Sequence, residues 1–81
     1  MSYIDQEATG KLLCLAVKSS SFSVSEICKE MNISTTSIYN WFRGDTLPSI
    51  ENLFLFAELV GQKVDDIVVY VSDRNNKADA A

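Results

Sequence analysis

The segment SVSEICKEMNISTTSIYNWFRGDTLPS, which runs from Ser23 to Ser49, decides the fold of this chain. Ser23 and Glu26 have the spacing of a capping box, in which two side chains satisfy free backbone amides reciprocally. Apolar residues then recur at i, i+3, i+4 and i+7, which gives a helix one buried stripe: Val24, Ile27, Cys28 and Met31. Asn32 tolerates a left-handed conformation and is placed to end this helix.

A second helix follows almost at once. Ser34 is a predicted cap for a helix from Thr35 to Arg43, with Ile38 and Phe42 facing inward, and Gly44 is the predicted end. Two short helices joined by a tight turn over residues 24–43 are typical of proteins that place side chains in the major groove of DNA.

The whole segment resembles, position by position, the Cro and phage-repressor (XRE) type of helix-turn-helix protein. Further matches to the fourth and fifth helices of that family lie at Leu53, Ala57, Leu59, Gly61, Val64, Asp66 and Ile67. Tyr3-Ile4-Asp5 and Ala8-Thr9-Gly10-Lys11 are similar to the opening of small single-domain members, so the resemblance covers roughly residues 3–71. It implies an all-α fold, a compact five-helix lambda-repressor-like DNA-binding domain.

We expect one domain over residues 1–81, with a folded core at 8–71 and a disordered tail at 72–81. Thr9 is the predicted cap of the first helix, and Asp65 that of the last. The first helix is expected to turn five apolar residues toward the core: Leu12, Leu13, Leu15, Ala16 and Val17. Val68 to Val71 is β-branched enough to form an extended end, with which Tyr3-Ile4-Asp5 can pair.

The charge of the chain argues against a strongly basic DNA-binding surface. Seven basic and eleven acidic residues give a net charge of −4, whereas DNA-binding domains usually have a basic footprint. The excess lies entirely in residues 45–70, and residues 24–44 are neutral. Because few cations can release few counterions, we expect weak non-specific affinity and a shallow salt dependence. Dimerisation on two half-sites would then let modest contacts add.

The family resemblance assigns roles to the second helix of the pair. Thr35, Thr36 and Asn40 align with positions that contact base edges, where a Thr methyl suits thymine and an Asn amide suits adenine. The alternative is that these short polar residues only cap and solvate a helix face. Four residues are assigned to the DNA backbone: Ser37, Tyr39, Arg43 and Thr46. Tyr39 can equally pack on a neighbouring helix, and Trp41 is expected to be structural.

Two features depart from the family, Val24 and the pair of Phe42 and Val17, and Asp45 bears on DNA affinity as well. Val24 replaces a frequent Gln, which removes a phosphate contact, and Asp45 places an acid in a loop that would approach DNA. Phe42 stands where Glu is common and Val17 where a paired Arg can occur; replacing both charges by apolar groups is often neutral or stabilising.

Ser49 is the predicted cap of a further helix, and Gly61 its predicted end. This helix is apolar over more than one face, which suggests a second subunit. The residues predicted for that dimer surface are Leu55, Phe56 and Tyr70. Neither a long apolar run nor a basic-then-apolar leader is present, so we expect no membrane span and a cytoplasmic protein. Cys14 and Cys28 are expected to be buried thiols, and no cofactor, metal or small-molecule substrate is indicated.

Two functions remain open at this stage. The first is a sequence-specific regulator, of repressor type, that binds double-stranded DNA at a palindromic operator as a homodimer. The second is a protein-interaction module on the same fold, antitoxin-like or an antirepressor partner, whose acidic fourth helix meets a basic protein. An enzyme is disfavoured because the chain has no His and no recognisable catalytic motif.

Overall fold

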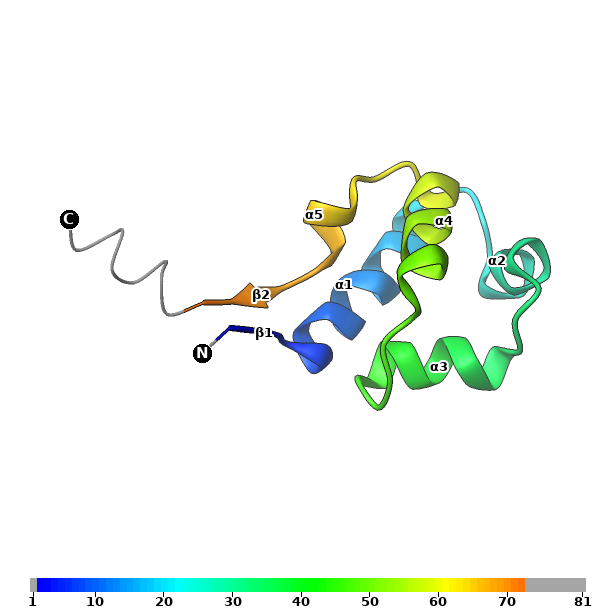
Figure 1. Ribbon diagram of the computed structural model, residues 1–81. Coiled ribbons are helices and arrows are strands. Elements are labelled where there is room, and N and C mark those ends of the chain that lie inside the picture. Colours follow the sequence, from blue (N-terminus) through cyan, green and yellow to red (C-terminus); the bar gives the residue numbers. More distant parts are fainter. Residues whose placement is uncertain (1, 73–81) are drawn as a thin grey trace.

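The computed structural model describes residues 2–72, and in this part of the chain it contains five helices and a two-stranded antiparallel ribbon (Figure 1). The predicted all-α class is therefore confirmed, with strands only at the two ends. In chain order the elements are β1 (Tyr3–Ile4), α1 (Gln6–Ser19), α2 (Val24–Met31), α3 (Thr35–Arg43), α4 (Ile50–Val60), α5 (Val64–Ile67) and β2 (Tyr70–Val71).

The helix ends between residues 23 and 61 are where local sequence signals predicted them. Ser23 and Glu26 form the capping box, and the Ser34 and Ser49 side chains accept bonds from the amides of Ser37 and Asn52. The left-handed residues that end α2, α3 and α4 are Asn32, Gly44 and Gly61, with φ of 56°, 81° and 74°. Short-range hydrogen bonding therefore sets the boundaries of the helix-turn-helix.

Two predicted helix starts are wrong. α1 begins at Gln6 and is capped by Asp5, whose Oδ1 accepts a bond from the Ala8 amide at 3.0 Å. Thr9 is completely buried instead, and its Oγ1 accepts a bond from the Val69 amide at 2.9 Å. α5 begins at Val64 after Lys63, without a side-chain cap, so that Asp65 lies inside the helix.

The core joins all five helices. Its completely buried side chains include Leu13, Ile27, Ile38, Phe56 and Ile67, and the Trp41 ring lies beside them, as predicted. Phe56 was predicted to form part of a dimer surface; that prediction is wrong, because the ring is enclosed within its own chain. Leu15 was predicted to face the core but is 56% exposed.

The predicted pairing of the two ends is confirmed. Tyr3 is opposite Val71 and Ile4 is opposite Tyr70, and the Asp5 amide donates to the Val69 carbonyl at 2.8 Å. Ser72, which the sequence assigned to the tail, is buried, and its Oγ accepts a bond from Ser2. The rest of the predicted disordered tail, residues 73–81, lies outside the described residues.

α1 and α3 approach each other very closely at Gly10. A Cβ atom on Gly10 would lie 2.6 Å from the carbonyl oxygen of Phe42 and closer still to that of Trp41. Real Cβ atoms do not approach backbone oxygens so closely, so only glycine allows α1 to cross the last turn of α3 at this distance.

Gly10→Ala should therefore destabilise the protein by roughly 1–3 kcal/mol, as overpacking does. This is opposite in sign to the usual effect, because replacing an interior helical Gly by Ala normally stabilises by roughly 0.5–1 kcal/mol. The free energy of unfolding in urea measures the difference. Ser19→Ala, at an exposed site on the same helix, is the control, and a more stable Gly10→Ala variant would contradict the close approach.

Candidate nucleic-acid interface

α2 and α3 form the helix-turn-helix at the end of the molecule opposite the β1–β2 ribbon (Figure 1). The chain reverses through Asn32 in the left-handed conformation, and the Ile33 amide donates back to the Cys28 carbonyl at 3.0 Å. Ile33 packs partly against the core. The backbone hydrogen bond of Ile33 and the packing of its side chain thus fix the turn, and the turn sets the position of α3.

The outward side of α3 carries the residues predicted to contact DNA. Ile38 and Trp41 are buried toward the core, whereas Thr35, Thr36, Tyr39 and Arg43 are exposed and Asn40 is half-buried. The structure therefore places the three predicted base-reading residues on one accessible face, together with Tyr39 and Arg43. Thr46 is exposed in the loop that follows α3.

Ser37 is tied into the start of α3. Its amide donates to Ser34 Oγ at 3.1 Å, and the two hydroxyl oxygens lie 3.0 Å apart. Residues of the first turn of α3 include no acid, so the positive end of the helix dipole is not offset there. A helix start of this kind favours a phosphate oxygen.

Arg43 is held by two polar partners. Its Nε donates to Asp45 Oδ2 at 3.0 Å, and its Nη2 donates to Asn40 Oδ1. The predicted phosphate-binding cation is thus joined to the predicted adenine-reading amide and to the acid of the following loop. Sequence reasoning predicted that Asp45 would oppose DNA binding, but it did not predict the pairing with Arg43. The signal available for that pairing was the separation of only two residues between the cation and the acid at the end of α3.

The ring contact of Tyr39 lies within its own helix rather than on a neighbouring one, and its contact with the DNA backbone stays a prediction. Its ring packs edge-on against Phe42 of the same helix, with centroids 5.6 Å apart and planes at 90°, and it remains 47% exposed. The packing restricts the ring, so the phenol hydroxyl is presented from a fixed position on the outward side of α3.

The start of α2 is acidic. The Ser23 amide donates to Glu26 Oε1 at 2.9 Å, and hydrogen bonds from the backbone and then the side chain of Ser23 lower the pKa of the Glu26 carboxyl. A lowered pKa in the folded state means that this carboxylate stabilises α2 above its ordinary pKa and loses that effect as the pH falls through the lowered value. Glu26 is therefore charged at neutral pH, so the start of α2 is less favourable for phosphate than that of α3.

The part of the chain that the structure describes has neither a three-residue metal-binding cluster nor a candidate membrane-spanning helix. No group of three His, Cys, Asp or Glu side chains within residues 2–72 is arranged to hold a metal ion. No helix among them is long and apolar enough to cross a membrane. Both cysteines are free; burial raises the pKa of the Cys28 thiol, and Cys14 is half-buried.

Comparison with known proteins agrees with this geometry. The helix-turn-helix family profile of the XRE type matches residues 16–67, which include α2, α3, α4 and α5. No curated protein and no solved structure matches the chain.

The pairing of Arg43 with Asp45 predicts that Asp45→Asn strengthens DNA binding. The substitution removes a negative charge beside the outward side of α3 and frees Arg43 to pair with a phosphate. We expect the affinity for random duplex DNA at low salt to rise about two- to fivefold, the range of an exposed ion pair. The slope of log K against log salt should steepen by up to ~0.9. Titration by fluorescence anisotropy at several salt concentrations measures both quantities.

Asp65→Asn is the matched control, because it makes the same charge change on α5. Equal effects of the two variants would mean that net charge alone is responsible and would contradict the specific role of Asp45.

Proposed function

Since this chain belongs to the XRE and Cro type of helix-turn-helix family, a family of DNA-binding regulators, we propose that it is a sequence-specific regulator of repressor type. It acts by occupying an operator, without catalysis and without a cofactor. The observation that carries the proposal is the outward side of α3, which presents Thr35, Thr36 and Asn40 while Ile38 and Trp41 anchor the opposite side.

In the proposed complex, α3 lies in the major groove. Thr35 and Thr36 contact thymine methyl groups, and Asn40 pairs with the edge of an adenine. Arg43 exchanges Asp45 for a phosphate, and the remaining backbone contacts come from Ser37, Tyr39 and Thr46. These contacts fix the register of α3 without reading sequence.

The shortage of cations makes a dimer part of the proposal. Residues 24–44 carry no net charge, and each half-site therefore gains little from counterion release. Two copies on a palindromic operator, with half-sites roughly 34–36 Å apart, add their base contacts. Of the surface originally predicted for the dimer, Leu55 and Tyr70 are exposed and remain candidates, whereas Phe56 does not. We place this activity in the cytoplasm, with the DNA.

A second candidate function is a protein-interaction module that meets a basic partner. The acidic excess of residues 45–70 supports it, as do the exposed apolar side chains of α4. It predicts that DNA binding is weak and unspecific.

Enrichment of a random duplex pool on the purified protein separates the two functions. The regulator should select a palindromic sequence and bind it at least ~10³-fold more tightly than random DNA. Failure to enrich any sequence, together with binding that vanishes at modest salt, would contradict the regulator and favour the protein-interaction module.

Substitutions on the selected operator test the individual roles. Asn40→Ala should cost ~1–3 kcal/mol and relax the preference at one base pair, whereas Arg43→Ala should weaken binding to all sequences alike. Affinities for the operator and for all single-base variants measure the difference. An unchanged sequence preference in Asn40→Ala would show that Asn40 does not read a base.

A further inference from the structure

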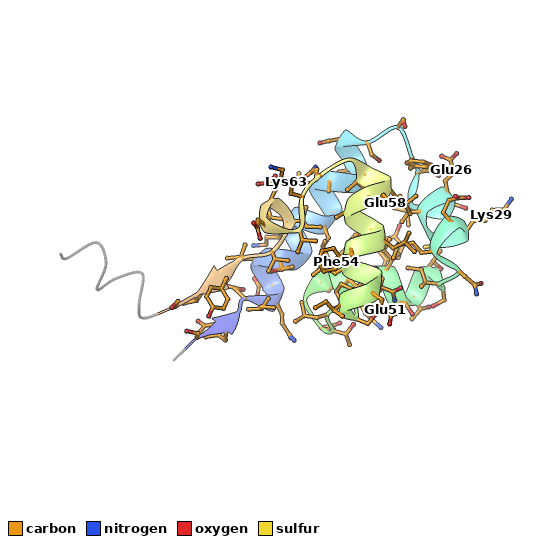
Figure 2. All side chains as sticks on the ribbon, turned by 45° about the horizontal axis from the view of Figure 1, so that its top comes forward. Glu26, Lys29, Glu51, Phe54, Glu58 and Lys63 are labelled. Atoms are coloured by element: carbon orange, nitrogen blue, oxygen red, sulfur yellow. The ribbon has the colours of Figure 1, made fainter. Side chains whose placement is uncertain are left out.

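α4 exposes an apolar and acidic face that the fold leaves uncovered. Ile50, Phe54 and Leu55 are 72%, 60% and 37% exposed. Glu51 and Glu58 are exposed on the same side of the helix (Figure 2). We call Glu51, Phe54, Leu55 and Glu58 the acidic face of α4.

α1 carries an open groove of roughly 360 Å³, lined by Lys11, Cys14, Leu15, Lys18 and Phe42. Its floor is apolar, and its two charged residues are cations. Leu15 is exposed here although the rest of the predicted apolar side of α1 is half-buried or buried. Lys11 has a contact with Glu7 at 3.7 Å, but such an exposed pair contributes little.

The two features have the same spacing and opposite charge. On α4 the order is Glu51, Phe54, Leu55 and Glu58; on α1 it is Lys11, Cys14, Leu15 and Lys18. In each helix two like charges stand seven residues apart, about 10 Å along the axis, with apolar residues at the third and fourth positions between them. Because both charges in a set are alike, parallel and antiparallel docking each pair every Glu with a Lys.

We propose that the acidic face of α4 in one copy of this protein docks into the α1 groove of a second copy. Phe54 and Leu55 then lie against Leu15 and Phe42, with an ion pair at each end. Burial of the exposed apolar side chains Phe54 and Leu15 supplies the attraction. The charges select the face of the partner to which α4 binds.

The charges also argue against contacts in which the same helix of two copies packs against itself. Two α4 helices packed on each other would bring Glu51 and Glu58 against the same carboxylates of the partner, and two α1 grooves would bring lysines together. Like charges in such positions are destabilising. The complementary arrangement joins two different faces. It forms either a two-fold dimer, in which each copy docks its α4 into the groove of the other, or a heterologous contact that closes into a larger ring or continues as a chain of copies.

This association goes beyond the proposed operator binding and does not depend on it. Neither face includes Thr35, Thr36 or Asn40. Phe42, which lines the groove, packs against Tyr39 at the edge of the outward side of α3. The assembly itself can be tested without DNA.

Paired charge reversals test the proposal. Sedimentation velocity in the absence of DNA should show self-association of the unmodified protein at low salt. The variants Lys11→Glu/Lys18→Glu and Glu51→Lys/Glu58→Lys should each associate at least ~10-fold more weakly, since each places like charges across both ends of the contact. An equimolar mixture of the two should recover association, because each groove then meets an α4 face of opposite charge. All four side chains are exposed, and circular dichroism verifies that the variants are folded.

Two controls carry the same charge changes elsewhere: Lys29→Glu/Lys63→Glu and Glu30→Lys/Asp65→Lys. Both should associate like the unmodified protein. An unmodified protein that remains monomeric would overturn the proposal. So would undiminished association of Lys11→Glu/Lys18→Glu, which would indicate contact between two α4 helices. Controls as weak as the reversals, or a mixture that does not recover, would also overturn it. None of these results bears on whether the monomer reads DNA.

Discussion

The structure depends on the close crossing of α1 over the last turn of α3. Gly10 faces the carbonyl groups of Trp41 and Phe42, and the left-handed Gly44 lies where a Cβ would be 2.7 Å from Glu7 Cα. Two glycines, one within α1 and one directly after α3, therefore permit the same approach. Because α1 also packs against α4 and α5, this crossing fixes α3 relative to the rest of the core. A side chain at either position would move the helix that carries the proposed DNA contacts.

The same crossing explains why the end of α3 is so polar. With Trp41 and Phe42 committed to the α1 side, Asn40, Arg43 and Asp45 are left on the solvent side, where they bond to one another. The group is exposed, so its ion pair is worth little in stability. In the proposed complex its role lies in binding: the pair keeps the guanidinium near the start of the loop and neutralises it until a phosphate replaces the carboxylate.

How far the sequence predicts this molecule depends on the range of the interaction. Ser23, Asn32, Ser34, Gly44 and Ser49 act on backbone groups within a few residues, and their roles were all predicted. Thr9 was misassigned because its hydroxyl serves the Val69 amide, far along the chain. The sequence also could not tell which apolar side of α4 is buried, so Phe56 was assigned to a dimer surface although it is enclosed in the core and Phe54 is exposed. The outward placement of Thr35, Thr36 and Asn40 followed from the buried stripe of α3, but the groove on α1 needs the tertiary position of Phe42.

The uneven charge distribution fits a chain with two separate surfaces, the acidic face of α4 and the outward side of α3. Acidic side chains that served only solubility would not be expected to alternate with the exposed apolar residues Ile50, Phe54 and Leu55. Exposed apolar side chains lower solubility. Acid interleaved with apolar groups instead describes a surface that selects a partner by charge and gains affinity from burial. The phosphates of DNA repel carboxylates. Because the acidic face of α4 is separate from the outward side of α3, one small domain can carry both the proposed contact between copies and the proposed contact with DNA. In the proposed operator complex, the neutral character of α2 and α3 limits what a single copy gains on DNA, and the base contacts of a second copy supply the remaining affinity.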